Sequence, residues 1–191
     1  MEAATLTGEY FLTGVREMAS GFLIQPDNTF QFFFAYGALD RMGSGTWSVK
    51  GDSIFLTSAA WSGKDFSLAK SSKTDNDFIN IVIDHTNPML IRHTYCSLQN
   101  GAAETWTPFD QRGDVQFPMQ EVNTLALQFE FCPERFSVIP VIEKNHNEFL
   151  LRVEPSLVEV FLENFSLQIN GTALIGRHPI LEGKEFRYEK Q

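Results

Sequence analysis

The stretch that decides the fold is "PDNTFQFFFAYGALDRMGSGTWSVKGDSIFL", residues 26–56. Its opening Pro-Asp-Asn favours a turn, because proline presets φ and Asn28 tolerates the positive φ that closes the turn. Apolar side chains then recur at every second position, at Phe30, Phe32 and Phe34. This spacing is the period of a strand with one face in the core. We therefore expect a strand directly after the turn.

The second half of the stretch predicts a hairpin. "GTWSV" and "SIFL" are short alternating segments, and "KGD" between them is a turn sequence. Trp47 and Val49 point one way in the first segment, and Ile54 and Leu56 repeat the pattern in the second. We expect Trp47 to anchor a core, since a large aromatic on the apolar face of a strand buries a large area.

Similar short alternating segments fill the rest of the chain, and helical periodicity is scarce. Asn-Gly pairs at 100–101 and 170–171 are strong signals for two-residue hairpins. Residues 155–165, "PSLVEVFLENF", suit either a helix or a strand, and the β-branched and aromatic content favours a strand. The sequence therefore predicts an all-β protein: a small antiparallel meander or barrel-like unit followed by a β-sandwich.

A polar stretch, "SSKTDND" at residues 71–77, lacks apolar anchors and divides the chain. Connections of this composition often mark domain boundaries. We therefore predict two units, residues 1–72 and residues 77–191. A single continuous sandwich is the alternative.

Residues 26–56 resemble a pattern of bacterial lipocalin-like β-domains. There a "D-G-T-F" turn leads into a strand, and a "G-x-W-x-V-x-G-D-x-I-x-L" hairpin follows. Asn28 stands here in place of the glycine of that turn. The resemblance implies a small barrel-like unit with a core tryptophan, and it specifies architecture rather than a ligand.

Residues 79–118 resemble the opening of transthyretin-like or carboxypeptidase-regulatory-like sandwiches. Asn87-Pro88 stands at the first turn of that pattern, and "FDQRGDVQF" from Phe109 matches its second turn. Asp110 would cap this turn and Gly113 would take positive φ. The resemblance implies an immunoglobulin- or transthyretin-like accessory sandwich without catalysis.

Composition excludes some partners. The formal net charge is −9 over 191 residues, and such an acidic surface repels nucleic acid, whose binding depends on Lys and Arg. No apolar run approaches the ~18 residues of a membrane span, and the N-terminus does not read as a signal peptide. We expect the cytoplasm, or an extracytoplasmic compartment if a leader has been removed.

The sequence offers no recognisable metal or cofactor site. Its four histidines show no ligand spacing, and we expect each to be a surface residue or a satisfied core residue. Cys96 and Cys132 are expected to be buried free thiols, with a disulfide between them as the alternative. We therefore predict no cofactor.

The opening stretch also holds the candidate ligand site. Phe33 faces away from Phe32 and Phe34, so the strand is apolar on both faces, as a pocket wall would be. Tyr36, Asp40 and Arg41 fall in "GALDRMGSG" and its flank, which we expect to be an adaptable loop at the rim. Arg16 could reach into the same pocket from the preceding strand.

These features favour a non-enzymatic binding or interaction module. Its partner would be a small amphipathic ligand, with its apolar part on Phe33 or Phe34 and its polar end held by Tyr36 and Arg41, or another protein. One alternative is a hydrolase or transferase whose dispersed site uses residues such as Arg16, Glu17, Tyr36 and Asp40. A structural assembly subunit that pairs through a sheet edge is the other.

Overall fold

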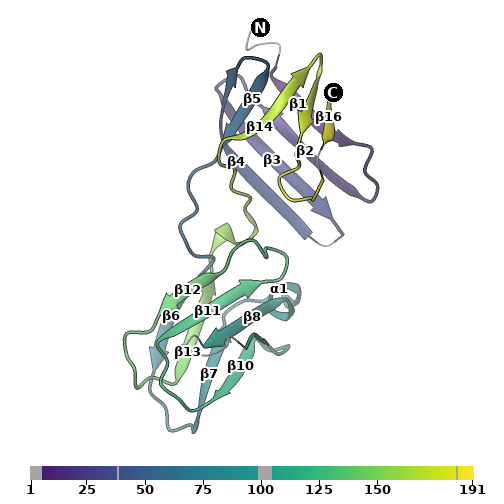
Figure 1. The fold of residues 1–191 in the computed structure, drawn as a ribbon. Helices are drawn as coiled ribbons and strands as arrows, with labels where there is room; N and C mark the ends of the chain where they lie inside the picture. The colour runs from purple at the N-terminus through teal and green to yellow at the C-terminus, as the bar shows by residue number, and fades with distance from the viewer. Residues whose placement is uncertain (1–5, 38, 99–104, 184) are drawn as a thin grey trace. The chain divides into compact units, whose positions relative to one another are not determined.

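The computed structural model describes residues 6–37, 39–98, 105–183 and 185–191. The chain is all-β and divides into two compact units (Figure 1). Unit 1 combines Met1–Trp61 with Val158–Gln191, and unit 2 is Ser62–Leu157. Figure 1 shows unit 1 built from both ends of the chain, in purple-blue and in yellow. Unit 2 is therefore an insertion into unit 1.

This division differs from the predicted boundary at 72–77. Residues 71–72 end strand β6 (Phe66–Ser72), and residue 78 begins strand β7 (Phe78–Ile83), in the same sheet. The polar stretch is thus a connection within unit 2. The buried amide of Asn147 explains how it is held there, because its Oδ1 accepts from the Thr74 N–H at 2.8 Å and its Nδ2 donates to the Asn76 carbonyl at 3.0 Å.

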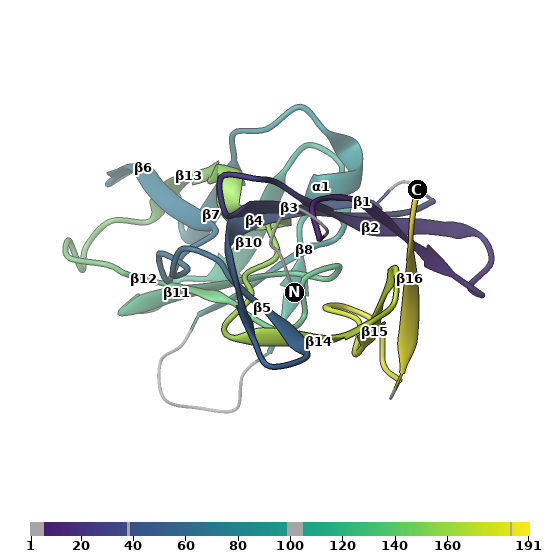
Figure 2. The same ribbon diagram turned by 90° about the horizontal axis from the view of Figure 1, so that it is seen from above.

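Unit 1 is a closed antiparallel barrel of eight strands in the order β1-β16-β15-β14-β5-β4-β3-β2 (Figure 2). The strands are β1 (Gly8–Thr13), β2 (Met18–Ile24), β3 (Thr29–Tyr36), β4 (Leu39–Lys50), β5 (Ser53–Thr57), β14 (Phe165–Asn170), β15 (Ala173–Gly176) and β16 (Phe186–Lys190). The barrel closes only when β14 pairs with β5, across the whole insertion. The predicted hairpin at 170–171 is confirmed as the β14–β15 turn.

Large aromatic and aliphatic side chains fill the barrel interior. Phe30, Phe32 and Phe34 all point inward from β3, as their spacing predicts. Trp47 lies beside them with 6% of its surface exposed, and its indole Nε1 donates to the Gln25 carbonyl at 2.9 Å. The predicted turn is also confirmed, since Asn28 has φ of 64°.

The region expected to be a rim loop is instead a strand. Residues 39–45 form the first half of β4 and pair with β3 along its length. Strand β3 ends at Tyr36 and β4 begins at Leu39, and Gly37 has positive φ. Alternating glycines suggest a loop in sequence, but here they allow close backbone approach: a Cβ at Gly43 would lie 2.7 Å from the Val160 carbonyl.

Unit 2 contains two four-stranded sheets. One sheet has the order β10-β7-β13-β6 and adds β10 (Asp114–Pro118) and β13 (Glu148–Val153) to the strands already named. The other sheet has the order β12-β11-β8-β9. Its strands are β8 (Thr94–Leu98), β9 (Thr107–Pro108), β11 (Thr124–Phe129) and β12 (Ser137–Pro140). The predicted hairpin at 100–101 lies outside the described residues.

One predicted turn of unit 2 is confirmed, and two other predicted segments have a different structure. The Asp110 turn is as predicted: its Oδ1 accepts from the Arg112 and Asp114 N–H groups, and Gly113 has φ of 87°. Asn87 does not make a simple turn but caps the short helix α1 (Pro88–Arg92). The strand favoured over 155–165 is wrong, since Pro155–Val158 forms the 3₁₀ helix η2 and β14 begins only at Phe165.

A buried ion pair and the hydrogen bonds around it reinforce the β6–β13 pairing at the two ends of unit 2. Arg135 Nε donates to Asp65 Oδ2 at 2.6 Å, and the two side chains are 8% and 3% exposed. Arg135 Nη2 also donates to the carbonyls of Ser156 and Leu157, at 2.8 and 3.0 Å. Ser156 Oγ in turn donates to Asp65 Oδ1 at 2.8 Å. The point where the chain enters unit 2 is thus fastened to the point where it leaves.

We predict that Trp47→Ala lowers the free energy of unfolding by about 3–5 kcal/mol, the usual cost of deleting a large buried aromatic. The variant also removes the donor to the Gln25 carbonyl. Chemical denaturation monitored by far-UV circular dichroism measures the change. A midpoint equal to that of the unaltered chain would show that Trp47 does not anchor the barrel.

Candidate binding groove

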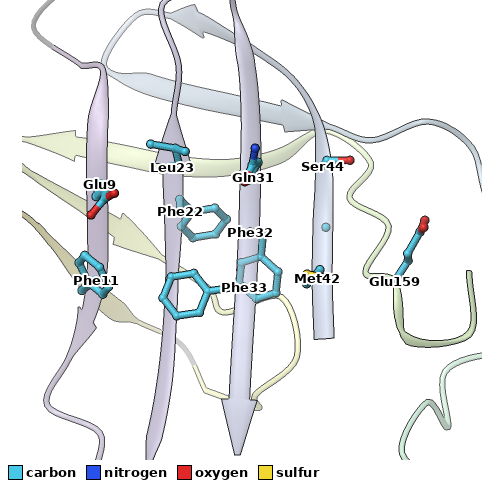
Figure 3. Close-up of a pocket in the computed structure, with 11 residues that line it drawn as sticks. Glu9, Phe11, Phe22, Leu23, Gln31, Phe32, Phe33, Met42, Ser44 and Glu159 are labelled. Atoms are coloured by element: carbon cyan, nitrogen blue, oxygen red, sulfur yellow. The ribbon is translucent and has the colours of Figure 1, made fainter. Parts of the chain in front are cut away.

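A groove of about 490 Å³ lies on the outer face of the barrel, across β1 to β4 (Figure 3). All of its lining residues belong to unit 1. Strand pairing arranges the outward-facing side chains of the lining in two rows that run across the sheet, one mainly apolar and one mainly polar. The alternation of the strands makes this possible, because the residues that face outward lie between those that fill the interior. Phe22, Phe32 and Gly43 also line the groove but belong to the inward face.

The apolar row holds the exposed hydrophobic surface of the groove. The register places Phe11 opposite Gly21, Gly21 opposite Phe33, and Phe33 opposite Met42. Phe11 is 36% exposed and Met42 is 63% exposed. In Figure 3 the side chains of Phe11, Phe33 and Met42 lie at one level across the strands. This is a continuous apolar strip on a face that is usually polar in antiparallel sheets.

Gly21 determines how the strip is shaped. A Cβ at this position would lie 2.9 Å from Phe33 Cε1 and would collide with the Tyr10 carbonyl. The ring of Phe33 therefore lies over the glycine and reaches Phe11, with ring centroids 5.7 Å apart at 64°. Aromatic coverage of a strand glycine is a known stabilising device. Here it turns one aromatic ring toward the floor of the groove.

Polar side chains border the strip. Glu9, Gln31 and Ser44 belong to the second row, in register with one another through Leu23. Glu159 comes from the chain that returns to the barrel, and a parallel bridge holds it beside Met42. Two of the polar lining residues are thus carboxylates, and the lining includes no basic side chain among the described residues.

Only one of the predicted site residues lines this groove. Phe33 does so, on the outward face that its position in the strand predicts. Arg16 is exposed in the connection between β1 and β2, and Tyr36 is exposed at the end of β3. Asp40 is exposed near the start of β4. None of these three contributes to the lining.

Arg41 differs most from the expectation. It pairs with Phe34 across the ladder, so its side chain shares the inward face, and it is only 2% exposed. Its Nη2 donates to the backbone carbonyl of Glu159 at 3.2 Å. The expectation that Arg41 holds a ligand's polar end beside Phe33 is therefore wrong, because the two side chains face opposite sides of the sheet.

Phe33 is the one lining residue among the predicted site residues, and four of the others show why they were not predicted. Glu9 and Phe11 share one face of "GEYFLT", and this alternation was a readable signal. Met42 was not predicted to line a sheet face, because its segment was expected to be a loop. Glu159 lies more than a hundred positions along the chain from Met42, and no local pattern predicts a pairing over such a separation.

The barrel interior also contains a Ser–His pair. His178 is 5% exposed, and its Nε2 lies 3.0 Å from Ser20 Oγ. Aromatic rings surround it, with Phe34 and Phe186 each at a centroid distance of 5.5 Å. Burial among these groups lowers the pKa of His178 to about 4.

The hydrogen bonds of this pair run in the wrong direction for nucleophilic catalysis. His178 Nδ1 accepts from the backbone N–H groups of Ile180 and Leu181, both at 3.0 Å. A neutral imidazole must then carry its proton on Nε2 and donate to Ser20, which in turn donates to the Phe33 carbonyl at 2.8 Å. A general base would have to accept from the serine instead. The pair is a satisfied core network.

Other titratable groups are separate from the groove. Among the described residues, no group of three or more His, Cys, Asp or Glu side chains is placed to hold a metal ion. Cys96 and Cys132 are buried free thiols, as expected, and burial raises the pKa of Cys96 to about 12. The Cys96 thiol is therefore not suited to nucleophilic chemistry at neutral pH.

Comparisons with known proteins give no match that indicates a function. No family model, no curated protein and no solved structure matches the chain. The lipocalin-like and transthyretin-like resemblances therefore stay predictions. Within the described residues, no helix has the length and apolar character needed to cross a membrane.

The low pKa of His178 predicts acid sensitivity of the barrel. An unfolded histidine takes up a proton near pH 6.5, whereas the folded one does so only near pH 4. Between these values the unfolded state binds more protons, so stability falls as the pH falls, by at most about 1.4 kcal/mol per pH unit. Denaturation at a series of pH values measures this slope.

His178→Asn provides the matched control, because an asparagine Oδ1 can still accept from the two backbone N–H groups but does not titrate. We expect the variant to be less stable at pH 7 and to show a shallower slope between pH 6.5 and pH 4. Equal slopes in the two proteins would show that His178 does not titrate as its burial implies.

Proposed function

We propose that the chain is a non-enzymatic binding module that holds a small amphipathic molecule in the groove on the outer face of the barrel. The observation that carries the proposal is the apolar strip of Phe11, Phe33 and Met42, bordered by polar side chains. A concave apolar surface with a few polar groups at its edge is the usual form of a small-molecule site.

A ligand bound on the strip would remove exposed apolar surface from water. Met42 and Phe11 leave apolar surface in water on a sheet face that would ordinarily carry polar residues. Covering such surface is favourable by about 25 cal/mol per Å², or about 0.8 kcal/mol for each methylene of the ligand that is buried. Much of this gain is offset by the lost freedom of the ligand. We therefore expect an eight-carbon chain to bind weakly, with a Kd of the order of millimolar.

The barrel interior supports the outer location. Its space is taken by buried aromatic and aliphatic side chains, among them Phe22, Phe34 and Tyr188. Phe34 was expected to contact a ligand, but it is a core residue with 4% of its surface exposed. The ligand contacts proposed here are those of Phe33 and its outward-facing neighbours.

We expect 1-octanol to shift the Met42 methyl signal saturably in a spectrum of [methyl-¹³C]methionine-labelled protein. Met89 and Met119 are 40% and 46% exposed but lie in unit 2, so their signals provide internal controls. Phe11→Ser should weaken the binding about threefold or more, because it removes one wall of the strip while leaving the reporter in place.

Val138→Ser is the matched control variant. Val138 is an exposed apolar residue on strand β12 of unit 2, and its replacement should leave the octanol affinity unchanged. A Met42 signal that does not respond to octanol, or that shifts no more than those of Met89 and Met119, would contradict the proposed function.

A further inference from the structure

We infer that the ligand of this groove carries a positive charge, so that its class is that of alkyl- or arylammonium compounds. This inference rests on the proposed function and adds the charge of the polar end. It follows from which charged side chains border the apolar strip, and from how their neighbours are already paired.

Glu9 supplies negative charge at the β1 end of the groove. It lies two residues before Phe11 on the same face of the strand, and its side chain is exposed. Its backbone is fixed, since the Glu9 carbonyl accepts from the Gln191 N–H at 3.0 Å. A cationic group above Phe11 would lie beside this carboxylate, and the face of the ring would add a favourable cation–π contribution.

Glu159 contributes the second carboxylate of the lining, at the opposite end of the groove. Its segment is tied to β4 by the hydrogen bond from the Val160 N–H to the Met42 carbonyl, at 2.7 Å. The buried Arg41 guanidinium holds the Glu159 backbone from the inner side, so this cation does not face the strip. Four strand spacings separate β1 from this segment, roughly 19 Å along the sheet. One head group therefore meets one carboxylate or the other.

Two basic side chains of β16 lie across the ladder from β1: Lys190 is in register with the inward-facing Tyr10, and Arg187, which shares the outward face, is already paired. Arg187 on β16 lies in register with Thr13 of β1, and its Nε donates to Glu189 Oε1 at 2.5 Å. Glu189 is itself in register with Phe11. This pair is locally neutral and does not cancel the charge of Glu9. The groove thus presents a negative potential to a ligand, in a chain whose net charge is −9.

Three probes with the same eight-carbon chain test the inference: octylammonium, 1-octanol and octanoate at pH 7. The Met42 methyl signal gives the affinity of each. At low salt we expect octylammonium to bind about fivefold or more tightly than octanoate, with octanol between them, since each exposed charge interaction changes affinity by a small factor. The difference should shrink in 0.5 M NaCl, because salt screens exposed charges.

The double variant Glu9→Gln, Glu159→Gln should bind octylammonium and octanol about equally while keeping its affinity for octanol. Glu163→Gln is the control, since it removes an exposed carboxylate of unit 1 that does not line the groove. It should preserve the preference for octylammonium.

The outcomes separate the two proposals. If octanol binds and octylammonium binds no more tightly, the inferred charge is wrong and the proposed function stands. The inferred charge is also wrong, and the proposed function still stands, if the double variant keeps the full preference for octylammonium over octanol. If none of the three probes shifts the Met42 signal, the proposed function itself is wrong.

Discussion

The antiparallel pairing of β6 with β13, which the buried Arg135–Asp65 ion pair reinforces at the ends of unit 2, is the interaction on which the closure of the barrel depends. The barrel of unit 1 closes only when β14 pairs with β5, although roughly a hundred residues separate the two strands, a loop that would be costly to close if it were flexible. The β6–β13 ladder places Phe66 opposite Val153, and Arg135 adds hydrogen bonds to the carbonyls of Ser156 and Leu157, so the entry and exit of unit 2 are held together. The folded insertion thus acts as a short connection, which lowers the closure cost by about 2 kcal/mol.

One end of the groove depends on the same closure of the barrel between β5 and β14. The chain that returns from unit 2 passes Glu159, which bridges to Met42, before it enters β14. One end of the groove is therefore made by a segment that reaches β4 only because the insertion brings it back. Phe30, Phe32 and their neighbours occupy the barrel's centre, so the candidate site lies in the groove on the outer face. Fold and candidate site thus share one constraint.

Local physics explains how much of this the sequence could predict. The period-two pattern around Phe32 and the positive φ of Asn28 specify β3 and its turn without any tertiary information. The rim loop was misassigned because glycine marks both flexible loops and close backbone contacts, and only the approach of Val160 to Gly43 distinguishes them. The domain division and the place of Glu159 depend on pairings far apart in sequence, and no local pattern encodes these.

Hydrogen exchange in an Arg135→Ala variant tests the central claim most directly. The amides of Ser58 and Ile169 donate to the carbonyls of Leu162 and Asp52, so they report on the β5–β14 seam. If the ion pair helps the β6–β13 pairing to keep the insertion short, its loss should speed their exchange, with about thirtyfold as the upper limit, and more than that of the Trp47 amide, which donates to the Asn28 carbonyl. Exchange at the unaltered rate in the seam, in a variant whose unit 2 amides exchange faster, would contradict the account.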